Sequence, residues 1–324
     1  MKVTLAIFAA LVAVAIAAPI VNHDIIAAVN NDESSTWTAG VNKAFEGMSV
    51  EQMKALLNVQ VTKEQPIGLV GPDAAKTMQE EADRVAASLP SSFEAAKAHP
   101  ECGTLLSPNG IENQERCGSC WAFSATEVLA DELCFLSKGK VQMELSAQDL
   151  VSCDRTNMGC NGGMLGAAWT YMERSGVATW ECLPYTSGNG TTGQCPSQCA
   201  DGSPIKRYHA TGAKHITSLF GRADKIAEQL MTYGVAQAAF TVYADFMQYK
   251  SGVYVHKTGN ELGGHAVKIV GFGELNGVPY WKVANSWGDS WGMDGFFLIK
   301  RGDNECGFEA DVWMGHAAST TPSL

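Results

Sequence analysis

The stretch Gln-Glu-Arg-Cys-Gly-Ser-Cys-Trp, residues 114–121, places two cysteines three positions apart, directly before a segment with helical character. Good helix formers follow Cys120, and apolar residues recur on one helical face over 128–136. A thiol at a helix N-terminus lies beside unpaired backbone N–H groups and the positive end of the helix dipole, which favour the thiolate. Cys120 is therefore a candidate nucleophile.

The Cys117/Cys120 pair also has the spacing of a metal or redox site. A zinc site of this type needs a second cysteine pair, and no later cysteines repeat the two-residue spacing. No metal and no cofactor are therefore predicted. A thiol oxidoreductase and a purely structural disulfide scaffold remain alternatives.

A cysteine nucleophile usually takes its base from a histidine that is distant in sequence. Gly-Gly-His-Ala, residues 263–266, leads into a strand-like run, and Asn-Ser-Trp-Gly, residues 285–288, follows a second one. Taken singly, His265 could be a turn residue with a hydrogen bond in the core, and Asn285 a turn former. Their occurrence in one order with the cysteine motif favours a catalytic role.

These blocks, with Cys-Asn-Gly-Gly at 160–163, resemble the papain-like cysteine peptidases, and within them most closely the cathepsin B group. The separation of 145 residues between Cys120 and His265 lies within the roughly 130–150 expected for such enzymes. The resemblance runs from about Leu89 to the end. It implies an α+β, papain-like fold of two lobes, helical on the left and β-barrel-like on the right, with a cleft between them.

The resemblance also implies the role of each site residue. Cys120 would be the nucleophile, His265 the base and Asn285 the group that orients the imidazole. The side-chain amide of Gln114 and the backbone N–H of Cys120 would form the oxyanion hole. Gly162 and Gly163 would bind the substrate through their backbone. The pocket for the substrate residue two before the cut would be lined by Leu165, Ala239 and Ala266, with Asp311 at its base. Trp287 would lie over the hydrogen bond between Asn285 and His265.

All ten cysteines lie after residue 100, and spacing alone leaves their connectivity open. The resemblance implies four disulfides, with Cys120 and Cys306 free. The expected pairs are Cys102–Cys134, Cys117–Cys160, Cys153–Cys195 and Cys182–Cys199.

Composition shifts along the chain divide it into three parts. An apolar run ending near Ala18 predicts a signal peptide over 1–17. Taken alone, residues 18–85 would be a small helical domain or a linker; the resemblance implies that they are an inhibitory propeptide. Residues 86–324 form the peptidase domain, with a helical lobe at about 100–205 and a β-rich lobe at about 206–315. Helices are predicted at 164–174 and 222–233, and strands at 236–242, 253–256, 265–272, 280–284 and 296–300.

Two departures from the cathepsin B group concern the cleft. The segment 183–194 is short and lacks the histidines that clasp a substrate's C-terminal carboxylate in that group, which predicts an endopeptidase without dipeptidyl-carboxypeptidase activity. It also carries a glycosylation sequon at Asn189. Glu115 stands where the family usually has glycine.

The net charge of −11 argues against nucleic-acid binding. The expected partners are protein and peptide substrates and the chain's own propeptide, with no membrane association; we expect a monomer that is secreted or lies in lysosome- or vacuole-like vesicles. His209, His215 and His256 are assigned no catalytic role. A catalytically silent homologue with a binding role is the alternative from another class.

Overall fold

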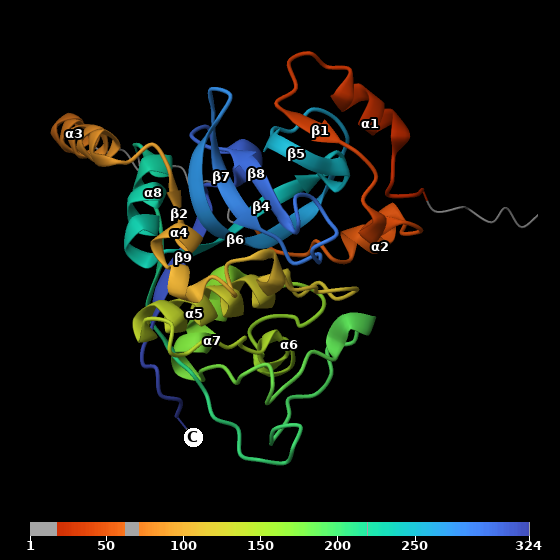
Figure 1. The fold of residues 1–324 in the computed structure, drawn as a ribbon, viewed down its shortest axis with the longest axis vertical. Helices are drawn as coiled ribbons and strands as arrows, with labels where there is room; N and C mark the ends of the chain where they lie inside the picture. Colours follow the sequence, from red (N-terminus) through yellow and green to blue (C-terminus); the bar gives the residue numbers. More distant parts are fainter. Residues whose placement is uncertain (1–17, 62–70, 219, 324) are drawn as a thin grey trace, which may run out of the picture.

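The computed structural model describes residues 18–61, 71–218 and 220–323 (Figure 1). The predicted signal peptide therefore lies outside the described residues. The main body has two lobes, a sheet above and helices α5, α6 and α7 below as drawn in Figure 1. Within the described part of the chain, no helix combines the length and apolar character needed to cross a membrane.

Helix α5 (Cys120–Ser137) is the centre of the helical lobe, and every residue from Cys120 to Cys134 is buried. Its surroundings explain this, since it packs on α6 (Ala147–Cys153) and α7 (Leu165–Arg174) on one side and on the sheet on the other. The side chain of Ser146 caps α6 by accepting from the Asp149 N–H at 3.0 Å. The predicted helix at 164–174 is found, one residue shorter.

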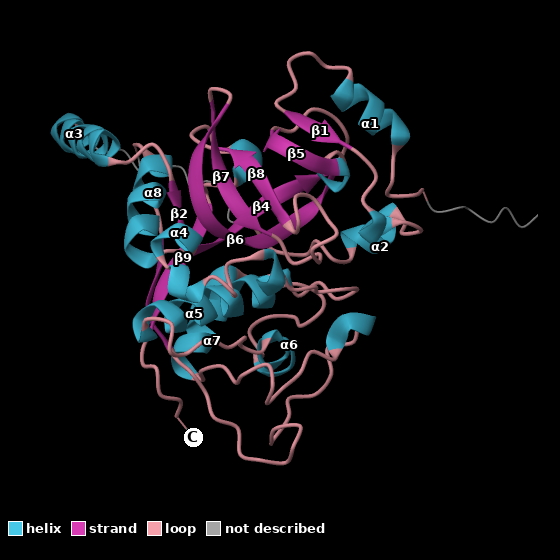
Figure 2. Ribbon diagram, viewed as in Figure 1, coloured by secondary structure: helices cyan, strands magenta, loops and turns pink. Residues whose placement is uncertain are grey.

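In the described part of the chain, nine strands form the sheet, eight of them along one path (Figure 2). The path runs β1-β5-β8-β7-β6-β4-β9-β3, and β2 pairs with β6. Among the described residues the sheet is open and does not close into a barrel. The strands are β1 (Trp37–Ala39), β2 (Phe93–Glu94), β3 (Ala210–His215), β4 (Ala236–Tyr243), β5 (Tyr249–Tyr254), β6 (Glu261–Leu275), β7 (Val278–Ala284), β8 (Phe296–Lys300) and β9 (Asp311–Ala317).

Strand β8 and helix α8 (Arg222–Tyr233) have the predicted bounds, and Gly234 ends the helix as expected. Strand β6 is longer than predicted, because its glycine-rich start pairs with β4 from Glu261 onward. Strands β1, β3 and β9 were not predicted. Their sequences lack a clear alternation of apolar and polar residues, so tertiary pairing decides their structure.

Four disulfides are present, and they are the pairs that the resemblance implies. Cys120 and Cys306 are free. All four bridges join residues within 102–199, so they tie together the helices and loops of the helical lobe. The sheet instead relies on its hydrogen bonds and apolar packing.

The N-terminal segment, residues 18–61, lies along the sheet and then along the junction of the lobes. Helix α1 (His23–Asn30) precedes β1, which extends the sheet beside β5, and the indole N–H of Trp37 donates to the Val255 carbonyl at 2.9 Å. Helix α2 (Val50–Lys54) begins with a capping box formed by Ser49 and Gln52. After α2 the chain enters the region of Cys120.

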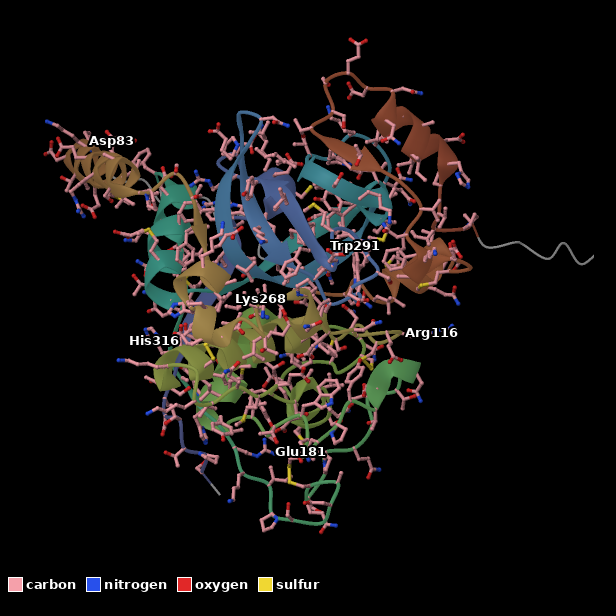
Figure 3. The ribbon with its side chains drawn as sticks, in the orientation of Figure 1. Asp83, Arg116, Glu181, Lys268, Trp291 and His316 are labelled. Atoms are coloured by element: carbon pink, nitrogen blue, oxygen red, sulfur yellow. A yellow bond between two sulfur atoms is a disulfide. The ribbon has the colours of Figure 1, made fainter. Side chains whose placement is uncertain are left out.

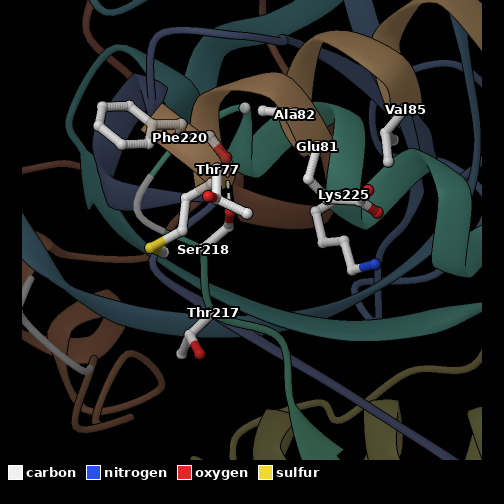
Figure 4. A pocket seen from close by; sticks show the side chains of 10 residues that line it. Thr77, Glu81, Ala82, Val85, Thr217, Ser218, Phe220 and Lys225 are labelled. Carbon is white, nitrogen blue, oxygen red and sulfur yellow. Dashed lines mark hydrogen bonds between the residues drawn. The ribbon is translucent and has the colours of Figure 1, made fainter. Parts of the chain in front are cut away.

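Helix α3 (Pro72–Ser88) lies against α8 at the edge of the molecule. A cavity of about 290 Å³ lies between α3 and the residues that precede α8, with Lys225 of α8 at its rim (Figure 4). Val85 is the one buried residue of α3. The predicted start of the peptidase domain at residue 86 falls inside α3, and extended backbone resumes at Leu89. The short helix α4 (Ala95–Ala98) follows β2.

A buried charge cluster joins the two lobes behind the cleft. Lys268 on β6 lies at the centre of the molecule (Figure 3), with its Nζ 2.8 Å from Asp131 Oδ2 and 3.9 Å from Glu127 Oε2, both on α5. All three side chains are almost fully buried. Burial, followed by the nearby acidic groups, raises the pKa of Glu127 to about 8, although Lys268 opposes the shift.

Stability should therefore depend on pH through Glu127. A carboxyl whose pKa is higher in the folded protein contributes stability that is full below its ordinary value of 4.5 and is lost as pH rises to about 8. We expect the free energy of unfolding to fall by about 3 kcal/mol more between pH 5 and pH 8 in the wild type than in Glu127→Gln. Urea unfolding at a series of pH values measures this difference.

The control for that series is Glu181→Gln, because Glu181 is exposed on the helical lobe (Figure 3). This variant should follow the wild-type pH dependence. Parallel curves for the wild type and Glu127→Gln would show that the buried carboxyl does not titrate in this range.

Candidate active site

Cys120 is the first residue of α5 and is fully buried. The loop before it is fixed by the Cys117–Cys160 disulfide and by a hydrogen bond from the Gly118 N–H to the Cys160 carbonyl at 3.0 Å. The backbone N–H of Ala266 donates to the Cys120 sulfur. Ala266 follows His265 on β6, so the start of α5 and this strand meet near the thiol. No hydrogen bond joins the Cys120 sulfur to His265, whose Nδ1 has no partner among the described residues.

His265 and Asn285 are brought together by neighbouring strands, β6 and the end of β7. His265 Nε2 lies 2.7 Å from Asn285 Oδ1, so the ring donates from Nε2 and the other nitrogen is left for a second partner. The indole of Trp287 stacks on the imidazole, with ring centroids 4.5 Å apart. Trp287 is 3% exposed, so this face of the imidazole is closed to solvent.

Burial keeps both reacting groups neutral in this form of the protein. It raises the pKa of the Cys120 thiol to about 12, against the lowering effect of the Ala266 N–H. It also lowers the pKa of His265 to about 4, and the hydrogen bond with Asn285 only partly offsets this. Between these values the sulfur keeps its proton and the imidazole is uncharged, so the buried form disfavours the expected ion pair.

Gln114 is buried beside Cys120, and its amide is held from both ends. Its Oε1 accepts from the Ser286 hydroxyl at 2.9 Å, and its Nε2 donates to the Cys117 carbonyl at 2.8 Å. The same Nε2 lies 3.4 Å from the carbonyl oxygen of Leu56, in the N-terminal segment. A peptide carbonyl of this segment thus occupies the donor that was expected to serve an oxyanion.

The N-terminal segment continues between the two walls as an extended strand. The Val59 N–H donates to the Gly264 carbonyl and the Gln60 N–H to the Gly163 carbonyl, both at 3.1 Å. Gly162 has φ +104°, and a Cβ there would lie 2.0 Å from the Asn58 carbonyl oxygen. Glycine is therefore required where the two backbones meet.

The expected pocket residues lie together on the sheet face that meets the helical lobe. Ala266 on β6 is directly opposite Ala239 on β4, which is opposite Asp311 on β9. Leu165, at the start of α7, belongs to the same apolar cluster as the two alanines. The carboxylate of Asp311 is 2% exposed and accepts from the Trp313 indole N–H at 3.0 Å.

The segment between Cys182 and Cys199 approaches the other end of the cleft. Gly188 accepts a hydrogen bond from the Arg116 N–H at 3.0 Å, and the Glu115 carboxylate lies against Gly188. Glu115 has φ +52°, a left-handed conformation that favours glycine. Asn189 of the sequon is exposed.

Three participants were missed by sequence reasoning. The Leu56 carbonyl is a backbone atom, which no residue type marks. Ser286 lies between two predicted site residues, and its proximity to them was the available signal. His215 lies 3.6 Å from Asp311 through the pairing of β3 with β9, for which the sequence held no local signal.

Residues 89–316 match the sequence model of the papain family of cysteine proteases. The chain belongs to this family. It is 42% identical over 283 residues to cathepsin B-like CP3 of Giardia intestinalis, covering 86% of this chain and 89% of that protein. Cathepsin B-like cysteine proteinase 4 of Caenorhabditis elegans is 38% identical, with 95% and 98% covered.

Solved structures agree with the fold of this papain-family chain. ProCathepsin B S9 from Trypanosoma congolense superposes with a TM-score of 0.79 at 35% identity, covering 93% of this chain and all of that one. Procathepsin L2 from Tenebrio molitor gives 0.63 at 28% identity, with 89% and 84% covered. Both neighbours are described as proenzymes.

The glycine contact gives a test of how tightly this papain-family chain holds its N-terminal segment. Gly162→Ala should lower the stability by at least about 2 kcal/mol more than Gly277→Ala, because the Asn58 carbonyl must move. Gly277 is the matched control, since it also has a positive φ, +79°, with open space around it. Thermal unfolding of the two variants measures the difference.

The stability losses of Gly162→Ala and Gly277→Ala should become equal once residues 18–61 have been removed, because only the cost of the positive φ then remains. If the difference in stability between the two variants persists in the shortened protein, the Asn58 carbonyl is not its cause.

Proposed function

We propose that this papain-family protease is a cysteine endopeptidase made as a zymogen, in which Cys120, His265 and Asn285 form the catalytic site. One arrangement supports the proposal. The Cys120 thiol lies at the start of α5, His265 and Asn285 are paired at 2.7 Å, and the Gln114 amide contacts the N-terminal segment that runs along the cleft. The substrates are proteins and peptides.

The chemistry follows from these groups. After the cleft opens, His265 takes the proton of Cys120, and the thiolate attacks the scissile carbonyl carbon. Gln114 Nε2 and the Cys120 N–H stabilise the oxyanion, and a lost donor of this kind typically costs about 100- to 1000-fold in rate. The imidazolium returns its proton to the leaving amine. Water, deprotonated by His265, then releases the acyl group from sulfur.

In this proposal the N-terminal segment is an inhibitory propeptide. It offers backbone carbonyls and amides to Gly163, Gly264 and Gln114, which a substrate would otherwise use. We place the start of the peptidase domain near residue 86, with a signal peptide over 1–17. The four disulfides suit a secretory route, outside the cell or in lysosome- or vacuole-like vesicles, with Asn189 glycosylated.

Labelling with an epoxide-type thiol inhibitor tests the function. The processed protein should be modified at Cys120 and lose peptidase activity. The zymogen should resist modification, because its thiol is buried and its pKa is raised to about 12. Cys120→Ser is the control, and mass spectrometry locates the modified residue.

Absence of labelling after removal of the propeptide would favour a catalytically silent homologue. Reduction of disulfide substrates without peptide hydrolysis would favour a thiol oxidoreductase.

We further propose that the enzyme cleaves internally and lacks dipeptidyl-carboxypeptidase activity. The segment 182–199 contains no histidine, so it offers no imidazolium pair to a terminal carboxylate. The nearest acidic neighbour of Gly188, Glu115, would repel such a carboxylate.

Two peptides that differ only in a free or amidated C-terminus provide the measurement. Amidation should change kcat/KM for release of the terminal dipeptide by less than about threefold, whereas loss of charged hydrogen bonds would cost about 10- to 100-fold. Release of dipeptides from the free acid at a rate that rivals internal cleavage would refute this assignment.

A further inference from the structure

Tyr185 joins the two segments that carry the proposed oxyanion donors. Its hydroxyl donates to the Gln114 carbonyl at 2.9 Å and lies 2.9 Å from Ser119 Oγ. A tyrosine hydroxyl has a single proton, so with that proton on the Gln114 carbonyl the Ser119 hydroxyl donates to the tyrosine oxygen. Gln114 supplies the side-chain donor, and Ser119 directly precedes the backbone donor of Cys120.

The side chain of Ser119 depends on this contact. Ser119 is fully buried at the N-cap of α5, but in the described part of the chain its hydroxyl caps no N–H of that helix. Its other contact, with the Cys117 carbonyl, is longer, at 3.4 Å. The Ser119 carbonyl accepts from the Ala122 N–H at 2.9 Å and so begins the helix. The tyrosine hydroxyl therefore helps to fix where α5 starts.

Tyr185 is itself held in place by the helical lobe. Its ring packs edge-on against Phe123 of α5, with centroids 4.8 Å apart, and stacks on Trp180 at 6.0 Å. The next two backbone N–H groups both donate to Gln148 Oε1 on α6, at 2.8 and 3.0 Å. Burial raises the pKa of the Tyr185 hydroxyl well above its usual value, so the donor keeps its proton at neutral and acidic pH.

We propose that Tyr185 is a positioning residue for the peptidase reaction, whose hydroxyl holds the Gln114 and Cys120 donors at the spacing that one oxyanion requires. The inference rests on the proposed function and deepens it. Without the hydroxyl, the Gln114 carbonyl would keep the Cys117 N–H at 3.2 Å, and Ser119 would lose its shorter contact. Two donors stabilise the developing charge only when both reach the same oxygen, and a displacement of about 1 Å can cost about 100-fold in rate.

Tyr185→Phe in the processed protein tests the inference, because it removes the hydroxyl and keeps the ring. We expect kcat for a peptide amide to fall by about 10- to 100-fold while KM changes by less than about threefold, since the lost effect belongs to the transition state.

The reaction of Cys120 with 2,2′-dipyridyl disulfide provides the second readout. The thiolate attacks one sulfur of the reagent, a new S–S bond forms, and pyridine-2-thiolate leaves, so no charge develops on a carbonyl oxygen. The rate of this reaction and its pH profile should therefore stay within about twofold of the wild type in Tyr185→Phe. Cys120→Ser gives the blank for any reaction at the second free thiol, Cys306.

Tyr171→Phe is the matched control, because Tyr171 lies on α7 of the same lobe and its hydroxyl donates to Asp149 Oδ1 at 3.0 Å. It should leave both rates within about twofold of the wild type. An unchanged kcat in Tyr185→Phe would overturn the proposal. A fall in the disulfide reaction as large as the fall in kcat would also overturn it, because Tyr185 would then support the thiol rather than the oxyanion donors.

Ser119→Ala keeps the inference testable if Tyr185→Phe does not fold, because it removes one of the two bonds and leaves the tyrosine. It should lower kcat by at least about threefold without changing the disulfide reaction, and an unchanged kcat would overturn the proposal. The wild type separates the two levels. A wild type that neither hydrolyses peptides nor reacts at Cys120 contradicts the proposed function, whereas an active wild type with an equally active Tyr185→Phe contradicts only the role of Tyr185.

Discussion

The ion pair between Lys268 and Asp131 fixes how the two walls of the cleft meet. Lys268 follows His265 by three residues on β6, and Asp131 lies on α5, three turns beyond Cys120. Both side chains are buried, so separating them would leave an unpaired charge in the interior, which typically costs about 3–5 kcal/mol. The helix therefore cannot slide along the strand, and the sulfur and the imidazole keep their relative position.

In the proposed function, inhibition by the N-terminal segment and catalysis use the same atoms of the cleft. The N-terminal segment contacts the cleft mainly through its backbone, with the Leu56 carbonyl at Gln114 and the Val59 N–H at Gly264. Backbone contacts are available to any peptide, so a segment that makes them competes with all substrates. Its coverage also removes water from Cys120 and His265, and this desolvation disfavours the charged forms on which attack depends.

Sequence reasoning succeeded where the signal is local. The Cys120 helix, α8 and β8 follow from periodicity and glycine stops. The roles of the site residues are predicted from motifs that occur in one order, and they stay a prediction. The disulfide pairs needed the resemblance, because spacing alone allows many connectivities. Strands β1, β2, β3 and β9 were missed, since they pair with strands far away in the chain. Helix α3 was missed although its own residues favour a helix, with Pro72 at its start and one buried residue, Val85. The β-rich lobe implied by the resemblance is present, as a sheet that stays open among the described residues.

The position of His215 near Asp311 shows why some contacts cannot be recognised from the sequence. Between Thr211, opposite His316, and Lys214, opposite Met314, the β3–β9 register shifts by one residue. Gly212, with φ +64° and open space around it, lies within this irregularity and permits it. Without the shift Lys214 would face Trp313, and His215 would turn to the opposite side of the sheet. A single bulge therefore decides whether an imidazole or an ammonium group lies beside Asp311.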